Sequence, residues 1–473
     1  VSLGGVIELA GAAAYGDQYS VMSYGGTSSG AFSDVTGLGA GVLQALITDA
    51  GGVIQLSIDA GSFLDVLPEA PSGVQLYYAQ SLDGARGTSY SDLSELYSLV
   101  DLLGPTDLAA AFDAIAPNDA VISGQGSIAM GDALGKRLDA RLRQVRRGER
   151  GFVTQGSAAG VQVASLDAMS SFSLISSQLA AVEASEASGV RPMKDGYGGF
   201  ASIDFFTGDA DSGLAGRKAD VEGFAITGGI DKTIGTDAII GGMISYSSSD
   251  NTMGSGMGDA EISGASVGLY GYVPFENRVF VDGHVSYGTY SVDMSRTAQL
   301  VGGTLAATGD TNADQLLVGA SVGREYQFDN GINVTPSVGL LHASYDIDAY
   351  SEKGSVIAMD VASRDLTSTQ LSLGAVMDWE LGESGTVRPM LGAAVVHDLD
   401  AGHDVVLATF VGAPTAAAVV FAGPDRSRTW LDLEAGLDVN VSDSMVATIA
   451  VRQTVNRDEL SQTVIGASAT LKF

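Results

Sequence analysis

The residues of this chain most suited to chemistry are charged side chains that gather in two kinds of segment. Seven of the 24 basic residues lie within positions 136–150, and six of them are Lys136, Arg137, Arg141, Arg143, Arg146 and Arg147. Acidic side chains alternate with apolar ones elsewhere in the chain, as Asp282, Asp432, Glu434 and Asp438 do. A charge held away from water is costly unless an opposite charge pairs with it. The two sets therefore either pair with each other or lie separately in water.

Other patterns that bind ligands or catalyse reactions are weak in this sequence. The four histidines, at positions 284, 342, 397 and 403, lack the spacing of metal ligands, and neither G-x-S-x-G nor a P-loop occurs. An inward-facing acid is able to act as a general acid or base, but a lining role explains an acidic wall more simply. We therefore expect no metal, no cofactor and no enzyme activity in this chain.

Composition narrows the class of protein. The net charge of −32 argues against a nucleic-acid partner. Hydrophobic residues make up 45% of the chain and the mean hydropathy is +0.21, yet there is no apolar run of about 18 residues, as a transmembrane helix requires. High apolarity without long runs is typical of a transmembrane β-barrel, in which lipid-facing residues alternate with lumen-facing ones. The chain has no cysteine, so disulfides are excluded.

Alternation of apolar and polar residues predicts twelve strands in the C-terminal part of the chain. The expected segments lie near 197–207, 219–231, 238–250, 260–273, 278–292, 311–327, 331–346, 365–381, 386–399, 427–441, 444–456 and 461–473. Twelve is an even number, as single-chain outer-membrane barrels require. Short connections alternate with long ones near 208–218, 251–259, 294–309, 347–364 and 400–426. Barrels of this kind have short periplasmic turns, so we expect both ends of the barrel domain on that side.

The final eleven residues form the clearest of these segments. Ile465, Ala467, Ala469, Leu471 and Phe473 share one face, and mostly small or polar residues share the other. Because an unpaired strand edge in lipid is costly, we expect this strand to pair with the first one and close the barrel. Aromatic residues toward strand ends fit either interface girdles or packing in the lumen; they are Phe205, Phe206, Tyr270, Tyr272, Tyr287 and Tyr290.

The region before the barrel has a different sequence pattern. Residues 1–64 contain short strand runs punctuated by glycine, typical of a rung of a parallel β-helix or of a small hairpin. Residues 65–193 are expected to be helical, with helices near 91–103 (capped by Ser91), 106–115 (capped by Thr106), 127–147 and 165–186. Residues 194–473 form the expected barrel domain. Val1 follows no export signal, so we interpret the chain as a processed or truncated piece of a protein exported by a signal peptide.

In the order of its motifs, most of the chain resembles the C-terminal translocator of a type V secreted autotransporter. The phrases at 19–26, 30–35 and 52–56 resemble the last rungs of a β-helical passenger, and the run from Asp107 through Arg143 resembles the linker that leads into the barrel. The runs 223–231, 241–247 and 389–398 and the terminal Phe473 resemble barrel strands of this family. One departure is the stretch 149–193, where the family usually has a short join.

The resemblance implies a mainly β fold: a twelve-stranded antiparallel transmembrane barrel with an α-helix in its lumen, preceded by a helical linker and the end of a parallel β-helix. It implies a monomer in the bacterial outer membrane that exports its own passenger and is inserted by the barrel-assembly machinery, which recognises the terminal strand. The basic segment would then be a plug among lumen acids at reduced dielectric. A solvated face of a stalk helix is the alternative, and either 127–147 or 165–186 fits as the pore helix.

Two other functions fit the same sequence. The first alternative is a diffusion pore or adhesin-type barrel whose N-terminal domain binds ligands and is not secreted. The second alternative is the remnant of a secreted hydrolase, which the gene sequence upstream of Val1 would reveal. Some autotransporters cut themselves at an asparagine in the barrel, but the single asparagine between Val1 and Asp250 is Asn118, next to Pro117 in an expected helix–helix turn. We do not expect self-cleavage.

Overall fold

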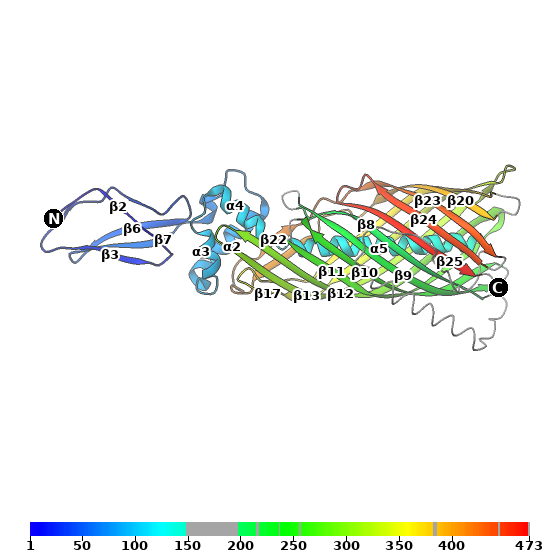
Figure 1. Ribbon diagram of the computed structural model, residues 1–473, viewed down its shortest axis with the longest axis horizontal. Helices are drawn as coiled ribbons and strands as arrows, with labels where there is room; N and C mark the ends of the chain where they lie inside the picture. The colour runs from blue at the N-terminus through cyan, green and yellow to red at the C-terminus, as the bar shows by residue number, and fades with distance from the viewer. Residues whose placement is uncertain are drawn as a thin grey trace.

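The molecule is elongated, with an N-terminal β region, a short helical region and a long barrel in sequence along one axis (Figure 1). The structure is a computed structural model that describes residues 1–147, 197–213, 217–235, 237–254, 257–381, 386–442 and 445–471. The expected helix at 165–186, the stretch 149–193 and Phe473 lie outside the described residues.

The barrel consists of long antiparallel strands, each paired with its neighbours in the chain. They are β8 (Tyr197–Asp211), β9 (Lys218–Ile234), β10 (Ala238–Met253), β11 (Gly258–Pro274), β12 (Val279–Leu300), β13 (Gly303–Arg324), β15 (Ile332–Ile347), β19 (Arg364–Trp379), β20 (Val387–Asp398), β23 (Thr429–Ser442), β24 (Met445–Val455) and β25 (Leu460–Leu471). β25 pairs with β8 from Leu460↔Ala210 to Leu471↔Gly199. The twelve expected strands and the closed barrel are therefore confirmed.

The two faces of the barrel wall differ as the alternation predicts. Outward positions hold exposed aliphatic side chains, such as Ile244, Val267 and Leu373, which are 67%, 59% and 64% exposed. Inward positions hold buried polar side chains, such as Ser245, Asp282 and Thr448. An apolar exterior around a polar interior is what a barrel in lipid requires. Among the described residues, no helix combines the length and the hydropathy needed to cross a membrane.

The two ends of the barrel differ in their connections. At the end where β8 begins, which we call the short-turn end, β11 and β12 are joined by a turn containing the short helix η2 (Glu276–Arg278). β14 (Tyr326–Gln327) pairs with the start of β15 at the same end. At the opposite end, which we call the long-loop end, the connections are longer and partly folded.

The expected loop at 294–309 is wrong, because β12 and β13 continue through it to a turn at Val301 and Gly302. Backbone pairing persists here although the apolar alternation weakens, because strands that extend beyond lipid no longer need one apolar face. Two other expected loops contain strands, namely β16 (Tyr350–Ser351), β17 (Lys353–Gly354), β18 (Met359–Val361), β21 (Val405–Phe410) and β22 (Val419–Ala422). β16, β18, β21 and β22 form one small sheet at this end, and β17 pairs with β13.

Five helices connect the N-terminal region to the barrel within the described residues: α1 (Phe63–Val66), α2 (Gly73–Ser89), α3 (Ser94–Val100), α4 (Pro105–Ala114) and α5 (Asn118–Arg146). The start of α2 is fixed by a capping box, in which Ser72 accepts from the Gln75 amide at 3.2 Å. The expected caps Ser91 and Thr106 are wrong. Leu93 precedes α3, and Gly104 precedes α4 with Pro105 in its first turn, where the missing N–H has no cost.

The basic helix begins at Asn118, earlier than the expected position 127, and runs along the inside of the barrel (Figure 1). Residues 118–126 include two glycines and only three apolar side chains in a row, so they carry little apolar periodicity. Burial against the barrel wall, rather than an amphipathic pattern, stabilises this first part of α5. The expected helix–helix turn at Asn118 is therefore limited to Ile115–Pro117.

The N-terminal region contains two short parallel strand pairs and one antiparallel sheet. β1 (Ser2–Leu3) pairs in parallel with β4 (Ser29–Gly30), and β2 (Val6–Glu8) pairs in parallel with β5 (Asp34–Thr36). β3 (Gln18–Ser23), β7 (Val53–Ala60) and β6 (Leu43–Ala50) form an antiparallel sheet. One hydrophobic core extends from Leu56 and Ile58 of β7 through the helices to Phe421 at the long-loop end.

Candidate functional site: a charged helix in the barrel lumen

The lumen of the barrel is occupied by α5, whose first half fits closely against the wall. A Cβ atom at Gly126 would lie 2.6 Å from the Nδ2 of Asn251, and a Cβ at Gly131 would collide with the Tyr345 hydroxyl. Glycine costs about 1 kcal/mol relative to alanine inside a helix. These positions are therefore explained by the close approach of the helix to the wall and not by helix propensity.

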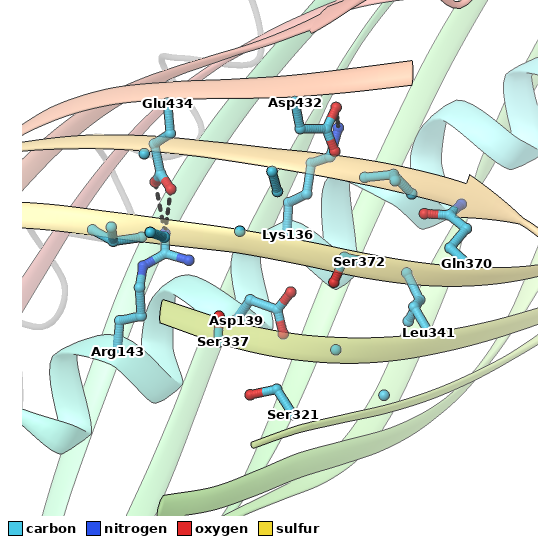
Figure 2. Close-up of a pocket in the computed structure, with 18 of the residues that line it drawn as sticks. Lys136, Asp139, Arg143, Ser321, Ser337, Leu341, Gln370, Ser372, Asp432 and Glu434 are labelled. Carbon is cyan, nitrogen blue, oxygen red and sulfur yellow. Dashed lines mark hydrogen bonds and ion pairs between the residues drawn. The ribbon is translucent and has the colours of Figure 1, made fainter. Parts of the chain in front are cut away.

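The second half of α5 and Arg147, which follows it, supply the six expected basic residues, and each of them lies within ion-pairing distance of an acid on the wall. Lys136 lies 3.2 Å from Asp432, and Arg143 lies 2.6 Å from Glu434. Arg146 pairs with Asp282. Figure 2 shows Lys136 and Arg143 directed from the helix toward β23. The expected acids thus lie where the basic residues can reach them.

The basic residue that follows the last turn of α5 contacts two strands at the short-turn end. Arg147 lies 2.7 Å from Asp438 of β23 and 2.8 Å from Asp378 of β19. The Oδ1 of Asp378 also accepts a hydrogen bond from Asn333 at 3.1 Å. This contact holds the end of the helix against β19 and β23.

Three wall acids in these pairs were not singled out from the sequence. Arg137 lies 2.9 Å from Asp204 of β8, Arg141 pairs with Asp231 of β9, and Arg147 reaches Asp378. Each of these acids occupies an inward position of its strand, where the neighbours in sequence face lipid. The alternation of each strand marks which acids face the lumen, so the sequence could have identified these three acids.

The ion pairs differ greatly in their exposure to water. The side chains of Arg137 and Asp204 are 2% and 1% exposed, whereas those of Lys136 and Asp432 are 18% and 22% exposed. Buried charges are tolerated only when further hydrogen bonds and dipoles satisfy them. Arg141 also lies over the ring of Phe200 at 4.9 Å, and Asp231 accepts from the Tyr270 hydroxyl at 2.9 Å.

Polar contacts continue along α5 toward the long-loop end. Asp132 pairs with Arg457 at 2.5 Å and accepts from Gln370 at 3.0 Å. Gln462 of β25 donates to the Ala129 carbonyl at 2.8 Å. The helix is therefore bonded to the wall along its length.

A cavity of about 180 Å³ remains beside α5. Small inward side chains leave this space, including Ser321, Ser337 and Ser372 (Figure 2). Asp139 lies on the cavity side of α5, and its side chain is 55% exposed. It lies 3.7 Å from the Nε2 of His284. Because the cavity has several polar side chains in its lining and exceeds the volume of one water molecule, it has room for water next to the helix.

Among the described residues, no group of three His, Cys, Asp or Glu side chains has the geometry to hold a metal ion. His342 and His397 bond to threonine hydroxyls at 2.8 Å. Asn118 is buried at the start of α5, where its Nδ2 donates to the Ala116 carbonyl at 3.2 Å. The wall acids that face Lys136 to Arg147 pair with these cations.

The terminal strand faces two environments. Ile465 and Ala467 point outward and are exposed, and Ala469 is half-buried, while Ser468 and Thr470 face the lumen and are buried. Leu471 pairs with Gly199 through its backbone. The strand is therefore the seam of the barrel.

Most of the aromatic residues named from the sequence do not form interface girdles. Phe206, Tyr270, Tyr272 and Tyr290 are buried inside the barrel. Tyr287 is exposed on the outer face, at 51%. These buried rings point into the lumen. They fill space around α5 that the charge pairs leave, because protein interiors are closely packed.

Comparisons with known proteins agree with this geometry. Residues 196–451 match the family model described as the autotransporter beta-domain. The chain is 30% identical over 213 residues to the uncharacterized protein YaiT of Escherichia coli, a match that covers 44% of this chain and 21% of YaiT. It is 27% identical over 213 residues to outer membrane protein B of Rickettsia japonica, covering 43% of this chain and 13% of that protein. The chain thus matches about a fifth or less of the length of these relatives.

Among solved structures, the chain is similar to the translocator domain of the autotransporter NalP from Neisseria meningitidis. The TM-score is 0.48 and the sequence identity is 17%, and the alignment covers 64% of this chain and 98% of that one.

Proposed function

The chain belongs to the autotransporter family, and from that premise we propose that it anchors itself in the bacterial outer membrane and exports its own N-terminal region to the cell surface. The short-turn end then faces the periplasm, as short turns do in such barrels. The long-loop end and residues 1–116 then lie outside the cell.

The observation that carries this proposal is the course of the chain through its own barrel. The N-terminal region lies beyond the long-loop end, α5 runs along the lumen, and β8 begins at the short-turn end (Figure 1). A chain whose N-terminal part has passed outward through the barrel has this course. In a pore with a periplasmic N-terminal domain, the function does not require the chain to run through the lumen in this direction.

We propose that α5 remains in the lumen as a plug after export. The ion pairs from Lys136 to Arg147 support this role, since they hold the helix to β8, β9, β12, β19 and β23. Withdrawal of the helix would leave wall acids such as Asp204 and Asp231 without these cations. A solvated stalk helix would not need such partners.

Protease accessibility on intact cells tests the export proposal. A protease recognition sequence is inserted at the exposed β6–β7 turn, Gly51–Gly52, and the same sequence is inserted at the short turn beside Asn330 as a control. We expect external protease to cut the first site in intact cells, and the second only after permeabilisation. Protection of the Gly51 site in intact cells would reject export and favour the non-secreted binding domain.

Single-channel conductance tests the plug. The full chain is expected to conduct poorly, deletion of residues 118–147 to raise the conductance several-fold, and deletion of 165–186 to leave it unchanged. Where the first deletion prevents assembly, replacing both Lys136 and Arg143 by Gln loosens the helix on its cavity side without removing it. If neither the deletion nor the double substitution raises conductance, the plug proposal fails.

Two partners follow from the same proposal. Lipid contacts the exposed aliphatic belt, of which Ile244 and Leu373 are members. The barrel-assembly machinery recognises the terminal strand through Ile465, Ala467, Ala469, Leu471 and Phe473, and the protein is a monomer. No enzyme activity is proposed for this chain.

A further inference from the structure

Helices of the linker and connections of the barrel share one apolar core at the long-loop end. The ring of Tyr78 in α2 is fully buried, 5.7 Å from the ring of Phe112 in α4. It also lies 5.8 Å from Phe410 of β21 and 5.7 Å from Phe421 of β22. The Tyr78 hydroxyl donates to the Ile115 carbonyl at 3.0 Å. Burial raises the pKa of Tyr78 well above its ordinary value, so the hydroxyl stays protonated and able to donate.

One buried arginine ties this core to the rest of the barrel. Arg296 of β12 pairs with Glu352 at 2.6 Å and donates to the Ile357 carbonyl at 2.7 Å. It also donates to the Ile115 carbonyl at the end of α4. Strand β12, the connection between β15 and β19, and the linker thus meet at one guanidinium group.

These elements come from separated parts of the barrel rim. Three strands, β13, β15 and β19, lie between β12 and β20 in the wall. The sheet of β16, β18, β21 and β22 therefore reaches from the β20–β23 side toward the β12 side. α2 covers this sheet with Tyr78, and α4 packs against α2 and β12. The first turn of α5 lies below, where Arg364 of β19 donates to the Ala120 carbonyl and to the Ser123 hydroxyl at 3.2 Å.

We propose that α2, α4 and this small sheet form a lid that seals the barrel mouth above the plug. The lid is completed only when the linker has emerged, because half of its core, including Tyr78 and Phe112, belongs to the linker. It then prevents water-soluble molecules outside the cell from reaching the lumen, and it keeps the linker from moving back. This role goes beyond export itself and beyond plugging by α5, because the lid is apolar and the plug below it is charged.

The absence of cysteine from the chain makes a direct test available. A single cysteine replaces Gln125, which is 1% exposed and lies in α5 below the lid. A charged, membrane-impermeant maleimide is added from outside to the full chain in the outer membrane, and the labelling rate is measured. A cysteine at Gly51, in an exposed turn, reports the unhindered rate and confirms that the N-terminal region is outside.

We expect the Gln125→Cys chain to label slowly, and to label at least tenfold faster when Tyr78→Ser or Phe421→Ser is added. Leu64→Ser is the matched control, because Leu64 is 40% exposed on α1 and outside the lid core; it should leave the rate unchanged. Tyr78 lies in the linker, so its replacement leaves the barrel strands intact even if Phe421→Ser impairs folding.

Fast labelling of the Gln125→Cys chain with an intact lid would overturn the proposal. An unchanged slow rate in the Tyr78→Ser chain would also overturn it, because α5 alone would then form the barrier. Labelling of the Gly51 position distinguishes these results from a failure of export, in which both positions would stay unlabelled.

Discussion

At the residue scale, the lumen shows how burial sets the energy of an ion pair. Arg137 and Asp204 are almost fully removed from water, whereas Lys136 and Asp432 border the cavity. Removing one member of a buried pair leaves an uncompensated charge, at a cost of about 3–5 kcal/mol. An exposed pair contributes about 0–1 kcal/mol, since water screens it. Arg137 and Lys136, one position apart in sequence, therefore differ in their contribution to the free energy of unfolding.

Replacing Arg137 by Met should lower the free energy of unfolding by about 3 kcal/mol, because Asp204 stays buried near the weaker partner Arg452, 3.8 Å away. Denaturant unfolding of the folded full chain in detergent measures this loss. Lys136→Met is the matched control and should cost less than about 1 kcal/mol.

Adding Asp204→Asn to Arg137→Met should restore most of the lost stability, since the charge left behind is then removed. An equal loss in the Arg137→Met and Lys136→Met chains would show that burial does not decide the strength of these pairs.

At the scale of elements, α5 is shaped by its surroundings more than by its own propensity. Its glycines at 126 and 131 face wall side chains that leave no room for a methyl group. Its residues 118–126 become helical because the lumen buries their side chains. The helix therefore fits the barrel only in one axial position, with its basic half toward the short-turn end.

Replacing Gly131 by Ala should destabilise the plugged state although alanine favours helix formation by about 1 kcal/mol. The added methyl collides with the Tyr345 hydroxyl, so the helix or the ring must move. Overpacking of this kind typically costs about 1–3 kcal/mol. The measurement is the rate of hydrogen exchange of α5 amides in the folded chain, which should rise.

Gly84 of α2 provides the matched control, because nothing lies within 4 Å of a Cβ added there. Gly84→Ala should leave exchange in α5 unchanged and stabilise α2 slightly. Slower exchange in the Gly131→Ala chain would contradict the close fit of helix and wall.

At the scale of the whole molecule, closure of the barrel depends on its two terminal strands. β25 pairs with β24 on one side and with β8 on the other, so the seam is paired on both sides from Thr463 to Leu471, as a strand in lipid requires. The seam also places Gly466 beside Asp204 and Arg137, where a larger residue would meet both side chains. Closure and plugging therefore involve the same strand.

Deleting Phe473, or replacing it by Asp, should reduce assembly of the barrel in the outer membrane before it affects the fold of residues 1–116. Closure is measured with cysteines at Ala201 and Ala469, which lie opposite each other across the seam. Opposed residues in an antiparallel pair are close enough to cross-link, so the closed barrel should form the disulfide, and the Phe473 variants should form much less of it.

A cysteine pair at Ala201 and Ala447 is the control, because Ala447 lies one strand further along the wall and is too distant to bond. Normal cross-linking and insertion without Phe473 would show that the terminal residue is not needed for assembly.

The sequence by itself determined the twelve strands, their inward and outward faces and the basic helix. Lipid and water impose an alternation with a period of two residues, and this local pattern marks the parts of the twelve long strands that lie in lipid. The lumen acids Asp282, Asp432, Glu434 and Asp438 could be predicted for the same reason.

The tertiary structure decided which charges meet and what closes the mouth. The pairing of Arg137 with Asp204 depends on strand register, helix position and helix rotation. The sequence of the helix or of the strand alone does not predict any of these. The lid joins Tyr78, Arg296 and Phe421, which lie far apart in sequence. Only closure of the barrel brings such residues together, because the tilt and register of all the strands together fix where each connection ends.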